Sequence, residues 1–257
     1  MCVDCACGLA GPGPSPKAGL NVSQKASSSP GFQPPAARSQ ALSLGLRLLA
    51  HNDRQAEANR VRFAAAGLVA VNLLSSPGSG KTALLEALAR HNAAAAKPVA
   101  LAALVGDLAT DLDAARLRAA GLAAAPITTG QACHLDAAMV DRGLDALEAG
   151  GLDLAQLDLL LIENVGNLVC PAAYDLGEQQ RLVLLAVGEG EDKPLKYPAT
   201  FASADLVVIS KVDLAEAVGF ERERALANIG AVAPRARTVE LSARSGAGLV
   251  ELMALLG

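Results

Sequence analysis

The run Ser75-Ser76-Pro77-Gly78-Ser79-Gly80-Lys81-Thr82 constrains the fold of this chain more than any other segment. It follows an apolar run, 69–74, that is typical of a buried strand, and it precedes an Ala/Leu-rich segment that predicts a helix to about residue 95. Glycines in such a turn let backbone N–H groups point at phosphate oxygens, and the helix start adds partial positive charge. Strand, loop, lysine and helix together predict a phosphate-binding loop rather than a Gly-rich turn that binds nothing.

Each residue of this loop has an expected role. Backbone N–H groups of Gly78, Ser79 and Gly80 would surround the phosphates, and Lys81 would neutralise β- and γ-phosphate charge during catalysis. The Thr82 hydroxyl is a candidate ligand of Mg²⁺. The full pattern is Gly-x4-Gly-Lys-Ser/Thr, and Ser75 replaces its first glycine, a departure that costs little if the local φ is negative.

Short apolar runs alternate with helical segments along the rest of the chain. This alternation predicts an α/β fold of the P-loop NTPase type, with a mostly parallel sheet flanked by helices. Beyond the loop, strands are expected near 99–104, 124–127, 157–162, 182–187, 206–209 and 238–241. Helices are expected near 41–66, 111–120, 133–148, 214–229 and 249–256.

The first forty residues differ in composition from the rest. Residues 8–40 are rich in Gly, Pro, Ser and Ala, which predicts a flexible linker between a Cys-rich tail, 1–7, and one nucleotide-binding domain, 41–257. The N-terminus lacks the basic and apolar parts of a secretory signal, and no apolar run reaches about 18 residues. We therefore expect a protein of the reducing cytoplasm that makes no membrane contact.

Composition argues against nucleic acid as a partner. Lys and Arg total 22 against 26 Asp and Glu, so the net charge is −4 and no broad basic field is expected. Aromatic residues make up 2% of the chain and Trp is absent, which leaves few platforms on which bases could stack. We expect no nucleic-acid partner.

Two later segments indicate guanine as the base of a bound nucleotide. Ser210-Lys211-Val212-Asp213 follows an expected strand and resembles the Asn-Lys-x-Asp loop of GTPases, with Ser210 in place of Asn. The Asp213 carboxylate would accept from guanine N1–H and the 2-amino group, which adenine lacks on that edge, and the Lys211 stem would lie along the base. Ser242-Ala243 resembles the loop whose backbone contacts the guanine oxygen. These segments favour GTP, and a solvated charged turn is the alternative.

Acidic residues follow two expected strands at the edge that carries the phosphate loop. Glu163 is a candidate Mg²⁺ ligand, and the Gly166 N–H would lie near the γ-phosphate and move when that group leaves. Asp107 is a candidate for Mg²⁺ or for positioning water, whereas Asp113 fits a helix-dipole partner better. No arginine or glutamine is evident at the γ-phosphate, which predicts slow intrinsic hydrolysis.

Three residues in the second half of the chain are candidate ligands of a transition metal. Cys133-His134 is expected to open a helix, and Cys170 lies in the loop after Glu163. Three ligands are one short of a closed zinc site, and a dimer could complete it across a two-fold axis. The alternative is that each cysteine is a small buried hydrophobe.

A second group of thiols, Cys2, Cys5 and Cys7, lies in a segment with no core to join. With the terminal amine or another nitrogen they could form a square-planar N/S site, which suits Ni²⁺. Zn²⁺ or Cu⁺ fits the same ligand types, and a redox Cys-x-x-Cys pair is a further alternative.

Taken together, these motifs resemble those of the HypB family of nickel-incorporation GTPases of nickel–iron hydrogenase maturation. The resemblance covers about residues 41–257 and the Cys-rich start. Besides the phosphate loop and Gly106-Asp107, the matching segments are Gly130-Gln131-Ala132-Cys133-His134-Leu135-Asp136-Ala137 and Glu163-Asn164-Val165-Gly166-Asn167-Leu168-Val169-Cys170-Pro171. These last two segments are the most specific.

The resemblance implies a homodimeric GTPase of the SIMIBI class. Its interface metal site, matched by Cys133, His134 and Cys170, would take Zn²⁺ or Ni²⁺, and the tail site, matched by Cys2, Cys5 and Cys7, would take Ni²⁺. Implied partners are a HypA-type nickel/zinc accessory protein and the hydrogenase large-subunit precursor. The chain departs from the family at Ala6, Val105 and Ser210, and it lacks a His-rich tract for bulk nickel storage.

We therefore expect a GTP-hydrolysing nickel metallochaperone whose GTP/GDP state is coupled to dimerisation and metal affinity. One alternative is a related metallochaperone of the urease type, whose Cys-Pro-His motif is absent here. The other is a metal-sequestering protein with a regulatory nucleotide site.

Overall fold

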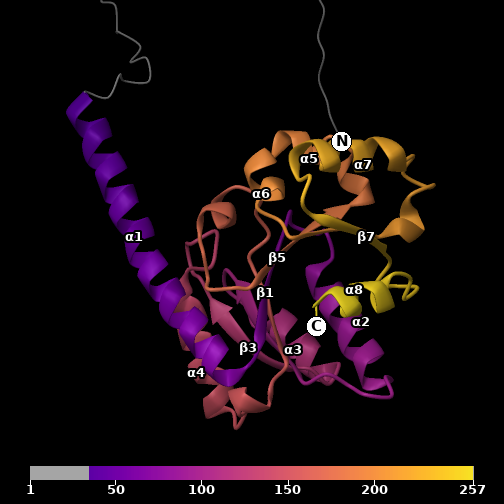
Figure 1. The fold of residues 1–257 in the computed structure, drawn as a ribbon, viewed down its shortest axis with the longest axis horizontal. Helices are drawn as coiled ribbons and strands as arrows, with labels where there is room; N and C mark the ends of the chain where they lie inside the picture. Colours follow the sequence, from indigo (N-terminus) through magenta and orange to yellow (C-terminus); the bar gives the residue numbers. More distant parts are fainter. Residues whose placement is uncertain (1–34, 257) are drawn as a thin grey trace, which may run out of the picture. The chain divides into compact units, whose positions relative to one another are not determined.

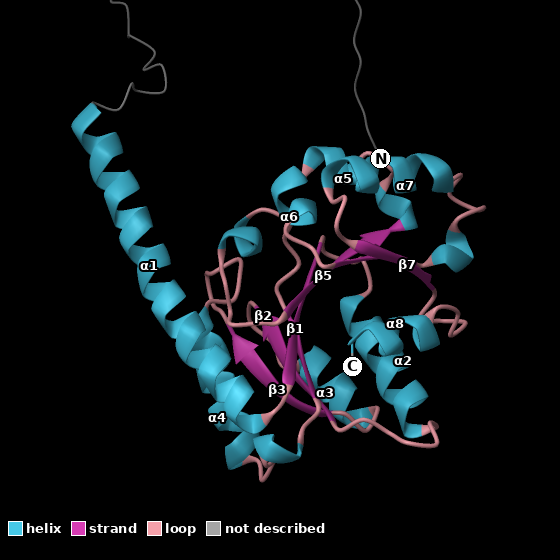
Figure 2. Ribbon diagram, in the orientation of Figure 1, coloured by secondary structure: helices cyan, strands magenta, loops and turns pink. Residues whose placement is uncertain are grey.

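The chain is built around one parallel β-sheet. The computed structural model describes residues 35–256, with side chains from residue 47 onward. Within the unit Leu42–Gly257, the sheet has seven strands in the order β3-β2-β4-β1-β5-β6-β7. All neighbouring strands are parallel, which confirms the fold class expected from the sequence. Helices flank the sheet, as Figures 1 and 2 show.

Strands and helices follow one another in the expected alternation. The strands are β1 (Val69–Ser75), β2 (Leu101–Asp107), β3 (Ala123–Thr128), β4 (Leu159–Glu163), β5 (Gln180–Ala186), β6 (Leu206–Ser210) and β7 (Arg237–Leu241). The helices are α1 (Pro35–Ala66), α2 (Lys81–Ala93), α3 (Leu112–Ala119), α4 (Ala137–Ala149), α5 (Lys193–Lys196), α6 (Pro198–Ala202), α7 (Arg222–Val232) and α8 (Leu249–Leu256).

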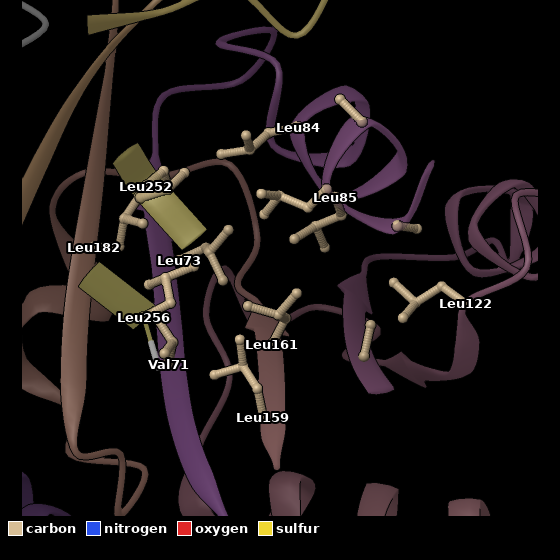
Figure 3. Close-up of a cluster of buried hydrophobic side chains, with 14 of the residues drawn as sticks. Val71, Leu73, Leu84, Leu85, Leu122, Leu159, Leu161, Leu182, Leu252 and Leu256 are labelled. Carbon is tan, nitrogen blue, oxygen red and sulfur yellow. The ribbon is translucent and has the colours of Figure 1, made fainter. Parts of the chain in front are cut away.

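Both faces of the sheet are buried, since successive side chains of a strand point to opposite sides. On one face, Val71 and Leu161 pack with the apolar sides of α2, α3 and α8 (Figure 3). On the other face, Phe63 of α1 joins a cluster with α4, and Phe201 of α6 joins a cluster with α7. This two-sided burial explains the nearly continuous apolar runs of the central strands.

Three parts of the chain differ from the sequence expectation. The helix α1 begins at Pro35, so residues 35–40 are helical rather than part of the linker. A proline fits this start because the first turn of a helix does not need its N–H. The helix α7 begins at Arg222 rather than near 214, because Val212–Leu214 forms a short 3-10 turn and Gly219 adopts a φ of 66°. Residues 187–205, for which no helix was expected, contain α5 and α6.

Within residues 35–256, no helix combines the length and apolar character that crossing a membrane requires.

Candidate functional site

The phosphate loop lies where β1 ends and α2 begins, as its sequence predicts. Gly78 and Gly80 have φ values of 73° and 101°, a region that L side chains rarely adopt, and Gly80 caps α2. The Lys81 side chain is buried, and its Nζ donates to Ser75 Oγ at 2.7 Å. Burial lowers the pKa of Lys81, and the nearby Glu163 charge opposes this shift. A phosphate oxygen is a natural acceptor for this ammonium group.

A cavity of about 460 Å³ opens beside this loop. It brings together Lys81 and Thr82 of α2, Asp107 of β2, Glu163 of β4 and Gly166 of the loop after β4. These five residues come from α2, β2, β4 and the loop after β4, which the sequence analysis placed at one sheet edge. The structure thus gathers the residues that we expected to act on a triphosphate and its metal ion.

Glu163 is the acidic centre of this cavity. Its Oε1 accepts a 2.8 Å hydrogen bond from the Thr82 hydroxyl, and its Oε2 is buried without a partner in the described part of the chain. Burial raises the pKa of Glu163 to about 7, and the charges of Lys81 and Arg116 oppose this shift. A buried, unsatisfied carboxylate oxygen beside a hydroxyl is a donor set that fits Mg²⁺.

Asp107 is anchored by its own loop. Its Oδ1 accepts from the N–H groups of Ala109 and Thr110 at 2.9 and 2.8 Å, and from the Thr110 hydroxyl at 3.1 Å. The two backbone hydrogen bonds lower the pKa of Asp107, so the carboxylate is ionised at neutral pH. It therefore offers a fixed negative charge at the wall of the cavity.

Gly166 contacts the phosphate loop directly. A Cβ at this position would lie 2.8 Å from Pro77 Cα, which is closer than real side-chain contacts. The backbone after β4 can approach Pro77 only because residue 166 is glycine. The segment that follows Glu163 therefore lies directly against the phosphate loop.

A second pocket of about 250 Å³ lies on the other side of the phosphate loop. Lys211, Asp213 and Ala243, which the sequence analysis assigned to the base, line this one pocket together. Lys211 adopts a φ of 61° and its Nζ donates to Gly78 O at 2.7 Å. Ser242 is buried and its N–H donates to Ala247 O at 3.0 Å, so it shapes the loop while Ala243 lines the pocket.

Ser210 stands where the Asn-Lys-x-Asp pattern has asparagine. Its hydroxyl is buried and donates to Ser79 O at 2.9 Å, which ties the end of β6 to the phosphate loop. The departure from the Asn-Lys-x-Asp pattern therefore leaves a direct link between β6 and the phosphate loop.

Cys133, His134 and Cys170 form a thiol–imidazole cluster. Their ligand atoms all lie within 4.8 Å of one another, so one metal ion can contact all three. Burial lowers the pKa of His134, which favours the neutral imidazole that binds metals. Hydrogen bonding with Cys170 raises the pKa of the Cys133 thiol, so a metal ion must displace a proton from this pair.

The expectation that Cys133-His134 opens a helix was wrong. These residues lie in the loop before α4, which begins at Ala137. Asp136 caps that helix, since its Oδ1 accepts from the Met139 N–H at 2.7 Å. Cys170 begins the short 3-10 helix Cys170–Ala173. The loop position of Cys133 and His134 lets both side chains turn toward Cys170.

Two asparagines that sequence reasoning missed join this cluster to the phosphate cavity. Asn164 follows Glu163, and its Oδ1 accepts from the Leu135 N–H at 3.0 Å, next to His134. Asn167 Nδ2 donates to Cys133 O at 3.3 Å, and the Asn167 backbone pairs with Ser75. Both residues belong to the matching segment 163–171, but no pattern in the sequence assigned either of them a role.

Two further side chains were not anticipated. The Tyr174 ring lies with its centroid 3.8 Å from that of His134 and supports the imidazole. Arg116 lines the phosphate cavity, although we expected no arginine there. Cys2, Cys5 and Cys7 lie outside the described residues.

The parallel sheet, the glycine–lysine loop at the end of β1 and the cavity beside it define a P-loop nucleotide-binding protein. The profile of the CobW/HypB/UreG nucleotide-binding domain matches residues 69–240, and the chain belongs to this family.

Two relatives from this family are named HypB. The chain is 51% identical over 211 residues to "Hydrogenase maturation factor HypB" of Azotobacter chroococcum, a match that covers 80% of this chain and 65% of the relative. It is 47% identical to "Hydrogenase/urease maturation factor HypB" of Helicobacter hepaticus, with 72% and 74% covered. The chain thus spans slightly less than two thirds of the length of the Azotobacter relative.

A solved structure shares the fold. The crystal structure of HypB from Helicobacter pylori in complex with nickel superposes with a TM-score of 0.75 at 42% identity. The alignment covers 80% of this chain and 93% of that one. The chain is therefore similar, over its nucleotide-binding domain, to a protein that was crystallised with nickel.

Proposed function

We propose that this chain is a GTP-hydrolysing nickel metallochaperone of nickel–iron hydrogenase maturation, in which the bound nucleotide changes the Ni²⁺ affinity of the thiol–imidazole cluster. One observation carries this proposal. The continuous segment Glu163–Cys170 supplies the buried acid of the phosphate cavity, the glycine against Pro77 and one cysteine of the cluster. The names of the relatives, and nickel in one solved relative, support the choice of cargo.

The base pocket supports GTP as the nucleotide. Asp213 would accept from the two N–H donors on the guanine edge, while the Lys211 stem covers the base and Ala243 offers a backbone N–H. An adenine would leave the Asp213 carboxylate without these donors.

For hydrolysis, we assign three residues of the cavity to distinct tasks. Lys81 neutralises the charge of the β- and γ-phosphates, and Gly166 offers its N–H to the γ-phosphate. Asp107, whose Oδ1 is already occupied by its own loop, orients the attacking water through Oδ2. Thr82 and Glu163 would hold Mg²⁺, which supplies charge neutralisation between the phosphates when it is bound.

The metal-transfer part of the proposal involves a second copy of the chain. Cys133, His134 and Cys170 give three ligands for Ni²⁺ or Zn²⁺, and the symmetry-related cluster of a homodimer would complete the site. We assign the tail 1–7 to Ni²⁺ capture through Cys2, Cys5 and Cys7, with residues 41–257 as the GTPase domain. Partners in the cytoplasm would be a HypA-type accessory protein and the hydrogenase large-subunit precursor.

Phosphate release from GTP tests the enzymatic part. The full chain should hydrolyse GTP slowly and only with Mg²⁺, and Lys81→Ala should abolish this activity. The Arg90→Ala variant, on the same helix but outside both nucleotide pockets, serves as the matched control. Nickel binding without any Lys81-dependent phosphate release would instead support a metal-sequestering protein with a regulatory nucleotide site.

The name of one relative points to a second enzyme that could receive the nickel. The Helicobacter hepaticus relative is named a hydrogenase/urease maturation factor, so urease is the alternative acceptor of the metal. Nickel transfer from the loaded chain to apo-hydrogenase precursor and to apo-urease, measured side by side, distinguishes the two.

A further inference from the structure

Arg116 is a side chain at the phosphate cavity that the proposed mechanism does not use. It lies on α3, the helix that follows the Asp107 loop, and it lines the same cavity as Lys81 and Glu163. Its charge opposes the rise in the pKa of Glu163, which places the guanidinium within electrostatic reach of the buried acid.

Two carboxylates hold the Arg116 guanidinium. Its Nη2 lies 3.0 Å from Glu86 Oε2, on the helix that begins at the phosphate loop, and its Nη1 lies 3.0 Å from Asp113 Oδ1. Half of the Arg116 side chain is exposed, as is a third of that of Asp113, whereas the Glu86 side chain is 19% exposed. The exposed pair with Asp113 contributes little to stability, and the pair with Glu86 is the more sheltered of the two. A ligand that carries more charge than either carboxylate can displace both pairs.

The terminal phosphate of GTP is such a ligand. A guanidinium binds phosphate oxygens in a two-pronged arrangement, and a phosphate carries more charge than either carboxylate. The cavity that Arg116 shares with Lys81 and Gly80 is the space in which the phosphates of a nucleotide on this loop would lie.

We propose that Arg116 is a catalytic residue that leaves Glu86 and Asp113 to contact the γ-phosphate of bound GTP. This inference rests on the proposed GTPase function. Water oxygen forms a bond to the γ-phosphorus while the bond from that phosphorus to the β–γ bridging oxygen breaks. GDP and inorganic phosphate are the products, and the proton of the water passes to the medium. Arg116 stays protonated throughout and neutralises the negative charge on the γ-phosphate oxygens.

The need to release Arg116 from its two carboxylates also predicts slow turnover. Each cycle requires the guanidinium to exchange Glu86 and Asp113 for phosphate, and the two ion pairs compete with the productive arrangement. Weakening one of them should therefore raise the rate or leave it unchanged.

Single-turnover GTP hydrolysis by the full chain tests this assignment. Arg116→Ala should lower the rate about 100- to 1,000-fold, with GDP affinity within about twofold of wild type because GDP has no γ-phosphate. Arg118→Ala is the matched control. Arg118 also lies on α3, but its Nη1 donates to Ala124 O at 3.0 Å and it does not line the phosphate cavity. Added guanidinium ion should restore part of the activity of Arg116→Ala.

A merely structural role for the ion pairs predicts a different result. Glu86→Gln removes the 3.0 Å pair to Arg116 and should retain at least the wild-type rate. The inference is overturned if Glu86→Gln loses as much activity as Arg116→Ala. It is also overturned if Arg116→Ala hydrolyses GTP at the wild-type rate while Lys81→Ala is inactive. In both cases the proposed GTPase function still stands. If the wild-type chain shows no Lys81-dependent hydrolysis, the proposed function and the inference are overturned together.

Discussion

The burial of Glu163 in the phosphate cavity should make the folding free energy of the chain depend on pH. Burial raises the pKa of Glu163 from the ordinary 4.5 to about 7, since Lys81 and the Thr82 hydroxyl only partly replace the lost hydration of the carboxylate. The folded chain therefore binds this proton more tightly than the unfolded chain. Its contribution to stability is fully present below pH 4.5 and is lost as the pH rises through about 7. The difference between these two pKa values corresponds to about 3 kcal/mol of folding free energy.

Glu163→Gln removes the ionisation and keeps an oxygen for the Thr82 hydroxyl. In EDTA, we expect this variant to exceed wild type in stability by up to about 3 kcal/mol at about pH 8.5, and to match it near pH 4.5. Urea unfolding followed by circular dichroism across this pH range measures the difference, with the exposed Glu216→Gln as control. With Mg²⁺ and GDP the advantage should shrink, because a bound cation stabilises the carboxylate. A gap between wild type and Glu163→Gln that does not change with pH would refute the reasoning.

Three further variants test other parts of the site. Gly166→Ala places a Cβ 2.8 Å from Pro77 Cα, and we expect GTP turnover to fall about 10- to 100-fold, measured by phosphate release; an unchanged kcat would show that this contact does not matter. Ser210→Ala leaves the buried Ser79 carbonyl without its hydroxyl donor, which should cost about 1–3 kcal/mol in urea unfolding and weaken GTP binding; wild-type values in both assays would contradict this role. Cys170→Ser should reduce the Ni²⁺ content of a chain that lacks the first seven residues while GTP hydrolysis continues; full nickel loading would exclude Cys170 as a ligand.

The sequence predicted the sheet and the phosphate loop well because both depend on local signals. The apolar run before Ser75 and the glycines at 78 and 80 specify strand, turn and helix start within a short segment. Parallel connectivity then places the ends of β1, β2 and β4 at one edge, so Asp107 and Glu163 could be assigned to one site.

The remaining features depend on contacts that a pattern of apolar residues does not encode. Cys133 and His134 precede an Ala-rich helix and resemble its first turn, but the Asp136 side chain caps the helix and sets its start. Arg116 has the spacing of an ordinary partner for Asp113, and only the packing of α3 beside α2 brings it to the phosphate cavity. The roles of Asn164 and Asn167 likewise arise from long-range hydrogen bonds.

The central claim is that the nucleotide state sets the affinity of the thiol–imidazole cluster for nickel. Calorimetric titration of Ni²⁺ into the chain without its first seven residues isolates this cluster, once with GDP and once with a non-hydrolysable GTP analogue. Because Gly166 contacts Pro77 and the same segment carries Cys170, we predict that the two Kd values differ by about fivefold or more. Equal Kd values in the two nucleotide states would contradict the account.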